Sequence, residues 1–444
     1  MMAVSDAERR SAEDLLRFID ASPSPWHAVT SCRERLEQGG FSPLSERDRW
    51  ALKAGDRRYV TRDDSSIIAF RVGGGSPAEA GFRIVGAHTD SPGFRVKPAA
   101  PHPRGSSTSL GVEVYGGPIL ATFADRDLLL AGRVMARDGD GLRPHLLRSP
   151  RPLVRLPNPA IHLNRGVNSE GLKFDLQEEL PLVLGTLRDE LPPDQQFRQW
   201  LAEQLELDAE RIASWELAVT DGQPGAFFGL EEEFLADSQL DNLGSCHAAV
   251  EGLLQAESES AFDGVSVIAL FDHEEIGSRS FKGADSSFLA DTLLRIGEAL
   301  GIAGTDHQRA LAASLILSAD MAHAHHPNFA RFHDAQHQVD LNGGPVVKVN
   351  ANQRYATDGG AAATFQLLCE ETNVCWQTYV HRNDLPCGST IGPITAAGLG
   401  IRCADVGNAM WSMHSARESA GTRDHWSMIR VLSHFFRRST LPLD

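Results

Sequence analysis

Residues 265–278 read VSVIALFDHEEIGS, a run of strand-forming residues that ends in two adjacent carboxylates and a glycine. The apolar run predicts a buried strand, and the glycine predicts the turn that follows it. Because successive side chains of a strand point to opposite faces, Glu274 and Glu275 cannot be equivalent. One of them can bind a metal ion while its neighbour exchanges protons with a water beside that ion. The alternative is a solvated acidic turn, and the rest of the chain decides between the two.

The size and charge of the chain narrow its possible functions. At 444 residues it exceeds what one hydrophobic core usually supports, so two domains are expected. Its 42 Lys and Arg residues against 59 Asp and Glu residues leave a formal net charge of −17. This charge argues against nucleic acid or an anionic membrane as a partner, and an acidic ligand would need a local basic pocket.

The cysteines and the apolar segments indicate the compartment. The six cysteines show no CxxC pair and no regular spacing, a pattern that predicts reduced thiols rather than a disulfide framework or a zinc knuckle. Residues 1–10 contain no apolar segment of signal-peptide length, and no apolar run of the chain is long enough to cross a bilayer. We therefore expect a cytoplasmic protein.

The sequence pattern predicts alternating strands and helices at both ends of the chain and mainly strands in the middle. The periodicity predicts helices around 15–19, 25–36, 242–254 and 425–436, and strands at 66–71, 82–87, 265–271 and 314–318. Between about residues 95 and 235, breaks rich in Gly, Pro and Ser separate segments of alternating character. This stretch predicts a β-rich module with one helix near 195–205.

The simplest arrangement is an α/β protein whose larger domain is formed by residues 1–94 and 236–444 and is interrupted by an inserted β-rich domain at 95–235. The larger domain is expected to have three αβα layers around a mixed, largely parallel sheet. Ligand sites in such sheets lie at the carboxyl ends of the strands. Each candidate residue should therefore directly follow an apolar run.

Acidic residues and histidines do follow such runs or open a helix. The candidates are His88, Asp90, Asp241, Glu274, Glu275, Asp320 and His414. Two histidines with several carboxylates form a mixed nitrogen and oxygen ligand set, suited to zinc, manganese or cobalt. A carboxylate that bridges two ions about 3.5–4 Å apart would make a two-metal hydrolase. Taken singly, each residue also fits a purely structural role. Asp241, for example, fits a helix cap.

Several longer motifs occur in one order along nearly the whole chain. They are SPWHA at 24–28, GAHTDSP at 86–92, QLDNL at 239–243, HEEIGS at 273–278, DMAHA at 320–324, KVNANQRY at 348–355, PCGSTIGP at 386–393 and MHSARE at 413–418. In these motifs the chain resembles the aspartyl aminopeptidases, dinuclear metallo-exopeptidases that form large tetrahedral homo-oligomers. None of the motif positions departs from the family pattern.

The resemblance implies two divalent ions, zinc first and manganese or cobalt as alternatives, with metal ligands at His88, Asp241, Glu275, Asp320 and His414. Asp241 would bridge the ions, Glu274 would be the general base, and Asp90 would orient the imidazole of His88. The expected reaction removes Asp or Glu from peptide N-termini. The ions lower the pKa of a shared water, Glu274 takes its proton, and the hydroxide attacks the first peptide carbonyl.

A preference for acidic residues requires a cation in the pocket for the first side chain, and the resemblance assigns that cation to Lys348. Its apolar neighbours in PVVKV, residues 345–349, argue against a solvated surface lysine. Arg354 and Tyr355 lie close by in sequence and could help to bind the substrate. Gly388 is assigned to substrate binding as part of its motif.

The resemblance also implies assembly. The inserted domain would be a dimerisation domain, and the homo-oligomer is expected to be a dodecamer. In the family, a histidine at the position of His162 reaches the active site of a neighbouring subunit. If this holds for the present chain, assembly would be needed for full activity.

Two other functions stay open. A related dinuclear hydrolase of neutral peptides, or an amidohydrolase, would not need Lys348. A non-catalytic assembly scaffold would use the metals for structure and would have no use for Glu274. A group of later histidines is interpreted as loop and helix residues, although the first could support the metal site: His323, His325, His326, His333 and His337.

Overall fold

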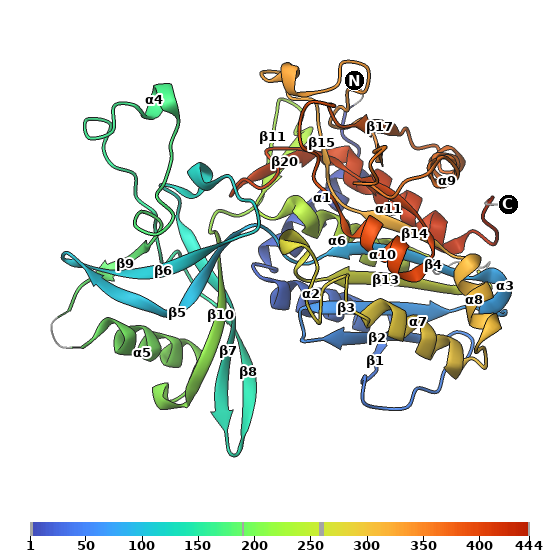
Figure 1. The fold of residues 1–444 in the computed structure, drawn as a ribbon, viewed down its shortest axis with the longest axis horizontal. Helices are drawn as coiled ribbons and strands as arrows, with labels where there is room; N and C mark the ends of the chain where they lie inside the picture. The colour runs from blue at the N-terminus through green and yellow to red at the C-terminus, as the bar shows by residue number, and fades with distance from the viewer. Residues whose placement is uncertain (1–2, 189–190, 257–261, 443–444) are drawn as a thin grey trace.

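Figure 1 shows the computed structural model of the chain, in which a mainly β module lies beside a larger body of strands and helices. The structure describes residues 3–188, 191–256 and 262–442. The strands form three sheets of nine, six and five strands. The nine-stranded sheet positions most of the candidate residues.

The nine-stranded sheet lies at the centre of the larger body. Its strands, in spatial order, are β1 (Ser42–Pro43), β2 (Arg57–Arg62), β3 (Ser66–Val72), β13 (Val265–Phe271), β4 (Phe82–His88), β14 (Leu315–Ala319), β18 (Arg402–Gly407), β16 (Val346–Val349) and β17 (Gln377–Val380). The four strands from β13 to β18 are parallel, and β3 and β16 flank them in antiparallel orientation. The predicted mixed, largely parallel sheet is confirmed.

Helices cover both faces of this sheet (Figure 1). One layer contains α1 (Asp6–Asp20), α2 (Pro25–Gln38), α6 (Leu240–Gln255), α9 (Gly359–Glu371) and α11 (Thr422–Arg437). The other contains α7 (Phe288–Ala299), α8 (Thr305–Ala312) and α10 (Ile391–Leu399). Strand β3 shows how alternation divides the core, since Ile67 packs with the first layer and Ile68 with the second. The predicted three-layer architecture is confirmed.

The six-stranded sheet is antiparallel throughout and comes from the middle of the chain. Its strands, in spatial order, are β8 (Gly141–Arg148), β7 (Leu128–Asp138), β10 (Ile212–Asp221), β5 (Gly93–Arg104), β6 (Ser107–Tyr115) and β9 (Leu182–Thr186). Helix α5 (Pro193–Leu205) packs on it through Phe197, whose ring meets that of Trp215 edge-on at 5.5 Å. The insert is therefore β-rich, as expected, while its boundaries at 95–235 and its role in dimerisation stay predictions.

The five-stranded sheet was not expected from the sequence. Its strands, in spatial order, are β11 (Ala226–Phe228), β12 (Phe234–Asp237), β20 (Glu418–Gly421), β19 (Ala409–Trp411) and β15 (Ala322–His323). Each strand has two to four residues, too few to show a period of two. This sheet matters for the site because β19 and β20 flank the turn that carries His414.

The helices predicted from periodicity are present as α1, α2, α5, α6 and α11. The sequence did not predict α7 to α10. It also missed the shortest elements, which are α3 (Pro77–Ala80), α4 (Val167–Glu170), η1 (Leu120–Phe123), η2 (Ala209–Arg211), η3 (Glu274–Ile276) and η4 (Ala330–Phe332). The element η3 contains both glutamates of the opening motif, so this turn is a single 3-10 turn.

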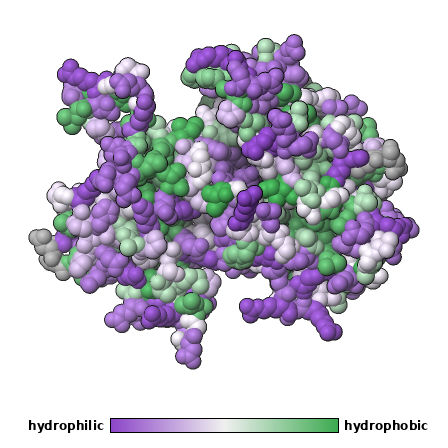
Figure 2. All heavy atoms as spheres, viewed as in Figure 1, coloured by the Kyte–Doolittle hydropathy of each residue, from purple (hydrophilic) through white to green (hydrophobic). Residues whose placement is uncertain are grey.

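All six cysteines are free thiols, in agreement with the sequence, and four of them are buried. One of these, Cys246, donates to the backbone carbonyl of His88 at 2.9 Å. No helix in the described ranges has both the length and the apolar character that a bilayer crossing requires. The face drawn in Figure 2 carries mainly hydrophilic side chains, with hydrophobic ones scattered among them.

A network of ion pairs ties the six-stranded sheet to the end of β13. Arg133 on β7 donates to the carboxylate of Asp63 through Nη1 and Nη2, at 2.7 and 2.9 Å. Asp63 also accepts from Nζ of Lys282 at 2.8 Å, and Lys282 pairs with Asp272 at 2.9 Å. The side chains of Lys282 and Asp272 are only 3% and 2% exposed, so water screens this pair weakly. Since Asp272 immediately follows β13, the network fixes the point where the glutamate turn leaves the sheet.

We expect Lys282→Met to lower the free energy of unfolding by about 3–5 kcal/mol, because Asp272 would keep a buried charge without its cation. Urea unfolding of the two proteins measures the difference. Arg155→Met is the control, because it removes an ion pair with Asp127 whose side chains are 49% and 70% exposed. The control should lose less than about 1 kcal/mol. Equal losses in both variants would contradict the buried network.

Candidate functional site

The candidate residues gather at the carboxyl ends of the central strands. His88 is the last residue of β4, the paired glutamates follow β13, and Asp320 follows β14. Asp241 lies at the start of α6, where its backbone is not yet helical. His414 lies in the turn between β19 and β20, with φ of 68°. Chain segments far apart in sequence thus meet at one edge of the sheet.

Asp241 stands between two groups of ligand atoms. Its Oδ1 lies 3.4 Å from Nε2 of His88, and its Oδ2 lies 3.4 Å from Nε2 of His414. On the first side, Oδ1 of Asp320 is 3.5 Å from Nε2 of His88. On the second side, Oε2 of Glu275 is 3.5 Å from Nε2 of His414. The ligand atoms of each group lie within 4.8 Å of one another, so the structure forms two ligand sets that share Asp241.

Both sets have the chemistry that a divalent ion requires. His88 and Asp241 are buried, and Oδ1 of Asp241 has no hydrogen-bond partner in the described chain. A buried carboxylate oxygen without a partner destabilises the protein unless a cation satisfies it. Imidazole nitrogen and carboxylate oxygen are the donors that zinc takes in catalytic sites. The residues therefore fit a divalent ion such as zinc.

The crowding of charge shifts the proton affinities in the site. Burial raises the pKa of Glu274 to about 8, although His88 opposes the shift. Burial and then Asp241 raise the pKa of Glu275 well above its usual range. Burial alone would lower the pKa of His414, but the carboxylates of Asp241 and Glu275 raise it to about 10. A cation between these groups would favour ionised carboxylates and neutral imidazoles, which are the forms that bind metals.

Asp90 holds the glutamate turn in place. Its Oδ1 accepts the backbone N–H of Glu274 and its Oδ2 that of Glu275, both at 3.1 Å. Oδ2 also accepts the hydroxyl of Tyr115 at 2.7 Å. Nδ1 of His88 lies 2.9 Å from the backbone carbonyl of Asp90 and 3.5 Å from its carboxylate. The role of Asp90 in orienting His88 stays a prediction. Its hydrogen bonds to the backbone of Glu274 and Glu275 give it a second role, which is to hold the glutamate turn.

The sequence did not indicate the groups that hold the second ligand set. The carboxylate of Glu418 accepts the backbone N–H of Asp241 at 3.0 Å and that of His414 at 2.6 Å, and burial raises its pKa to about 8. The carbonyl of Gly117 lies 3.0 Å from Nδ1 of His414. A signal for Glu418 was present, because it ends the MHSARE motif. Tyr115 and Gly117 come from the insert, and no sequence pattern links them to the site.

Lys348 lies beside the first ligand set. It is only 2% exposed, and its Nζ is 3.5 Å from Oδ2 of Asp320 and donates to the carbonyl of Met321 at 3.2 Å. The ring of Tyr355 lies 5.2 Å from the same ammonium group. The apolar context of Lys348 therefore predicted its burial correctly, and the structure brings Tyr355 to it.

The other predicted substrate residues make no hydrogen bond or ion pair with the ligand sets in the described part of the chain. Nε of Arg354 donates to the carbonyls of Cys387 and Gly388 at 3.1 and 3.2 Å, and Arg354 and Gly388 are both exposed. His162 is exposed in a turn of the insert and makes no hydrogen bond or ion pair with the described part of the chain. The structure of one chain therefore does not bring His162 to the site.

The histidines that follow Asp320 do not form a metal site. In the described residues, none of them belongs to a group of ligand atoms close enough to share an ion. His323 instead packs near Tyr379 and His381, with ring centroids 5.7 and 6.3 Å apart. Burial lowers the pKa of His323 to about 4, so the ring is neutral at pH 7.

Two further groups of possible ligands occur in the described residues: His88, Glu274 and Glu275 within the site, and Asp14, His247 and Glu251 away from it. The guanidinium of Arg35 donates to Asp14 at 2.8 Å and to Glu251 at 2.9 Å. A cation therefore already occupies the space between these carboxylates, and this second group is a structural ion network.

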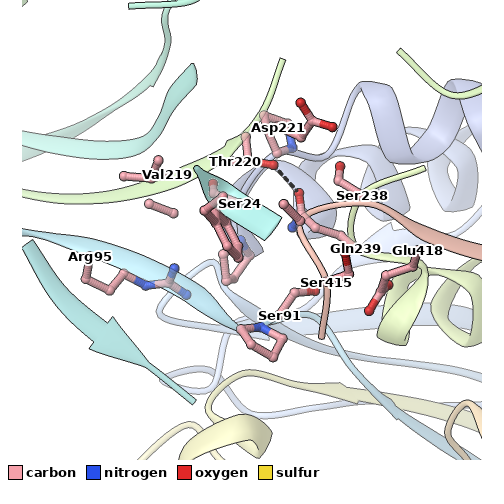
Figure 3. Close-up of a pocket in the computed structure, with 16 residues that line it drawn as sticks. Ser24, Ser91, Arg95, Val219, Thr220, Asp221, Ser238, Gln239, Ser415 and Glu418 are labelled. Atoms are coloured by element: carbon pink, nitrogen blue, oxygen red, sulfur yellow. Dashed lines mark hydrogen bonds between the residues drawn. The ribbon is translucent and has the colours of Figure 1, made fainter. Parts of the chain in front are cut away.

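A small cavity lies beside Glu418 (Figure 3), and its lining includes Ser91, Gln239 and Ser415. The hydroxyl of Thr220 donates to Oε1 of Gln239 at 3.1 Å, the bond drawn in the figure. The volume of the cavity is ≈ 20 Å³. Since one water needs at least about 10–15 Å³, the cavity has room for water and is too small for a peptide.

The chain matches known proteins over nearly its whole length. A family model described as Aminopeptidase I zinc metalloprotease (M18) matches residues 18–436. The Probable M18 family aminopeptidase 2 of Pseudomonas paraeruginosa (strain DSM 24068 / PA7) is 47% identical over 434 residues, which are 97% of this chain and 99% of that protein.

Two solved structures have the same fold. A chain in the cryo-EM structure of the Ape4 and Nbr1 complex is 39% identical, with a TM-score of 0.94 over 98% of this chain and 88% of that one. A chain of the S. cerevisiae mApe1 dodecamer is 26% identical, with a TM-score of 0.85 over 96% of each chain. At this coverage the likeness includes the nine-stranded sheet and the insert.

We expect Tyr115→Phe to weaken zinc binding by about 10–100-fold. The variant keeps the ring of residue 115 and removes the hydroxyl that donates to Asp90, which supports the ligands. Titration of the metal-free protein with zinc against a competing chelator measures the affinity. Tyr59→Phe is the control, since its hydroxyl donates to Glu37, which is not one of the candidate ligands. Equal zinc affinity in the two variants would contradict the role of the Tyr115 to Asp90 bond.

Proposed function

The chain belongs to the M18 family of aminopeptidase I zinc metalloproteases, and from this we propose that it removes Asp and Glu from the N-termini of peptides. The family and the site agree on a metallo-aminopeptidase. The acidic preference rests on one observation, the buried ammonium of Lys348 only 3.5 Å from Asp320 of the ligand cluster.

Two divalent ions would occupy the site. His88 and Asp320 would hold one, Glu275 and His414 the other, and Asp241 would bridge them. The support is that the two carboxylate oxygens of Asp241 face opposite ligand sets, each at 3.4 Å from an imidazole nitrogen. Zinc fits these donors, and manganese or cobalt accept the same ones. Bound divalent ions supply Lewis acidity, which lowers the pKa of a water and polarises the peptide carbonyl.

Glu274 would be the general base. Its Oε2 is 3.9 Å from Nε2 of His88, and its side chain is 14% exposed, so water can reach it. It lies outside the two ligand sets that contain Asp241, and its carboxylate lies within 4.8 Å of ligand atoms of His88 and Glu275. The carboxylate takes a proton from the attacking water and returns it to the nitrogen of the leaving peptide. Asp90 would keep the base in position through the backbone N–H of Glu274.

Lys348 would bind the side chain of the first residue. An ammonium group has three N–H donors, and Met321 and Asp320 account for two of them. The third can meet a substrate carboxylate. Because a neutral side chain would leave this donor unpaired, Asp and Glu are favoured as first residues. Tyr355, Arg354 and Gly388 would complete the pocket.

The active form would be a homo-oligomer, and the mApe1 dodecamer is the model for its size. Residues 95–235 would form the dimerisation domain. The exposed His162 would reach the active site of a neighbouring subunit, so full activity would require assembly. The six free cysteines fit a reducing compartment such as the cytoplasm.

A dinuclear hydrolase of neutral peptides is the second candidate. One observation favours it: Lys348 already contacts Asp320, and this carboxylate neutralises part of the charge of the lysine. Matched peptides that begin with Asp, Glu, Leu or Lys separate the two functions. A non-catalytic scaffold is the third, and it would not need the carboxylate of Glu274.

We expect Glu274→Gln to lower kcat by about 10²–10⁴-fold, the contribution of a general base, while zinc content and oligomeric state stay unchanged. Peptide hydrolysis, metal analysis and light scattering measure the three quantities. Glu231→Gln, which changes an exposed carboxylate, is the control and should keep full activity. Unchanged turnover in Glu274→Gln would contradict the general base, and absence of turnover in the unchanged zinc-loaded protein would support the scaffold instead.

We expect Lys348→Met to lower kcat/KM for an Asp-initiated peptide by about 10–100-fold, since a hydrogen bond between charged groups is lost. The value for a matched Leu-initiated peptide should change only a few-fold. Steady-state hydrolysis of both peptides by the zinc-loaded protein gives the ratio, and Lys53→Met, an exposed lysine, is the control. A parallel loss on both peptides would show that Lys348 supports the site without selecting the substrate.

A further inference from the structure

Arg83 is a buried cation at the opposite end of β4 from His88. It is the second residue of that strand and only 2% exposed, and it is one of the largest fully buried side chains of the described structure. A guanidinium in this position needs hydrogen-bond partners and an opposite charge.

The contacts of Arg83 supply some of the hydrogen bonds and no opposite charge. Nη1 donates to the carbonyl of Ala80 at 3.1 Å, and Nη2 has only a 3.5 Å contact with the carbonyl of Ser439. Its Nε is buried and has no hydrogen-bond partner, and the ring of Phe262 lies 4.2 Å from Cζ. Among the described residues, no carboxylate forms an ion pair with this guanidinium. Burial and Arg438 lower the pKa of Arg83 to about 10, so the group stays charged at pH 7.

Arg83 lines a cavity of ≈ 580 Å³ at the edge of the molecule. Arg402 lines it as well, paired with Asp358 at 3.2 Å. The remaining lining is formed by residues 312–314, Gly400 and residues 439–441, together with Glu79 and Ala80. Glu79 is exposed and does not pair with Arg83. The size is in the range of cavities that hold small organic ligands.

We propose that this cavity binds a small oxyanion of the phosphate or carboxylate class, with Arg83 as its main charged partner and Arg402 as the second. A guanidinium is a permanently charged donor suited to the oxygens of such an anion. In Arg83 the Nη atom with the longer contact is Nη2, 3.5 Å from the carbonyl of Ser439, and this is the nitrogen that would donate to the anion, while Nε stays buried. Since the chain has a net charge of −17, only a local cation pair can hold an anion there.

Inorganic phosphate is the first probe, in calorimetric titration of the zinc-loaded protein at constant ionic strength. We expect saturable binding, weakened at least tenfold in Arg83→Met and partly restored in Arg83→Lys. Arg155→Met, which breaks an exposed ion pair, is the control and should bind phosphate as the unchanged protein does. Parallel titrations with acetate and succinate distinguish a carboxylate ligand from phosphate.

Arg402→Met keeps the test decisive if Arg83→Met does not fold, because the side chain of Arg402 is 42% exposed. It should weaken the binding of phosphate or of the better carboxylate at least several-fold. Absence of saturable binding of all three anions to the unchanged protein would overturn the proposal. The proposal would also be overturned if Arg402→Met and every folded Arg83 variant bound the anion with unchanged affinity. Peptidase activity does not enter this test, so the result is independent of the proposed function.

Discussion

The site depends on the carboxylate of Asp241, which is shared between two groups of ligands. Its two oxygens lie at equal distance from two imidazoles, and the surrounding chain fixes its backbone on both sides. Glu418 accepts its N–H, and the hydroxyl of Ser91 donates to its carbonyl at 2.7 Å. These bonds fix its backbone, and its side chain is buried away from solvent. The simplest way to satisfy both of its oxygens is a cation on each side.

The fold supplies the remaining ligands through two separate parts of the chain. The central parallel strands end side by side, which brings His88, the glutamate turn and Asp320 to one edge. The insert then adds the hydroxyl of Tyr115 and the carbonyl of Gly117. The ion network from Arg133 to Asp272 joins the same two parts beside the glutamate turn. The insert therefore contributes to the geometry of the site as well as to the surface of the molecule.

The parts of the structure that the sequence predicts are those with a local signal. His88, Glu275 and Asp320 follow strongly apolar strands, so their meeting at one edge could be inferred. Helix α10 has the sequence IGPITAAGL, and its glycines and proline give little helical signal. Tyr115 and Gly117 reach the site only because the insert folds back onto the sheet, which is a tertiary contact. The role of Glu418 likewise became clear only from its bonds to two backbone N–H groups.

The most direct test of the shared carboxylate is an anomalous difference map, recorded at the zinc edge from crystals of the zinc-loaded protein. We expect two peaks per chain, one on either side of the Asp241 carboxylate. One peak should contact His88 and Asp320, and the other Glu275 and His414. A single peak, or peaks away from Asp241, would contradict the shared carboxylate as the organising element of the site.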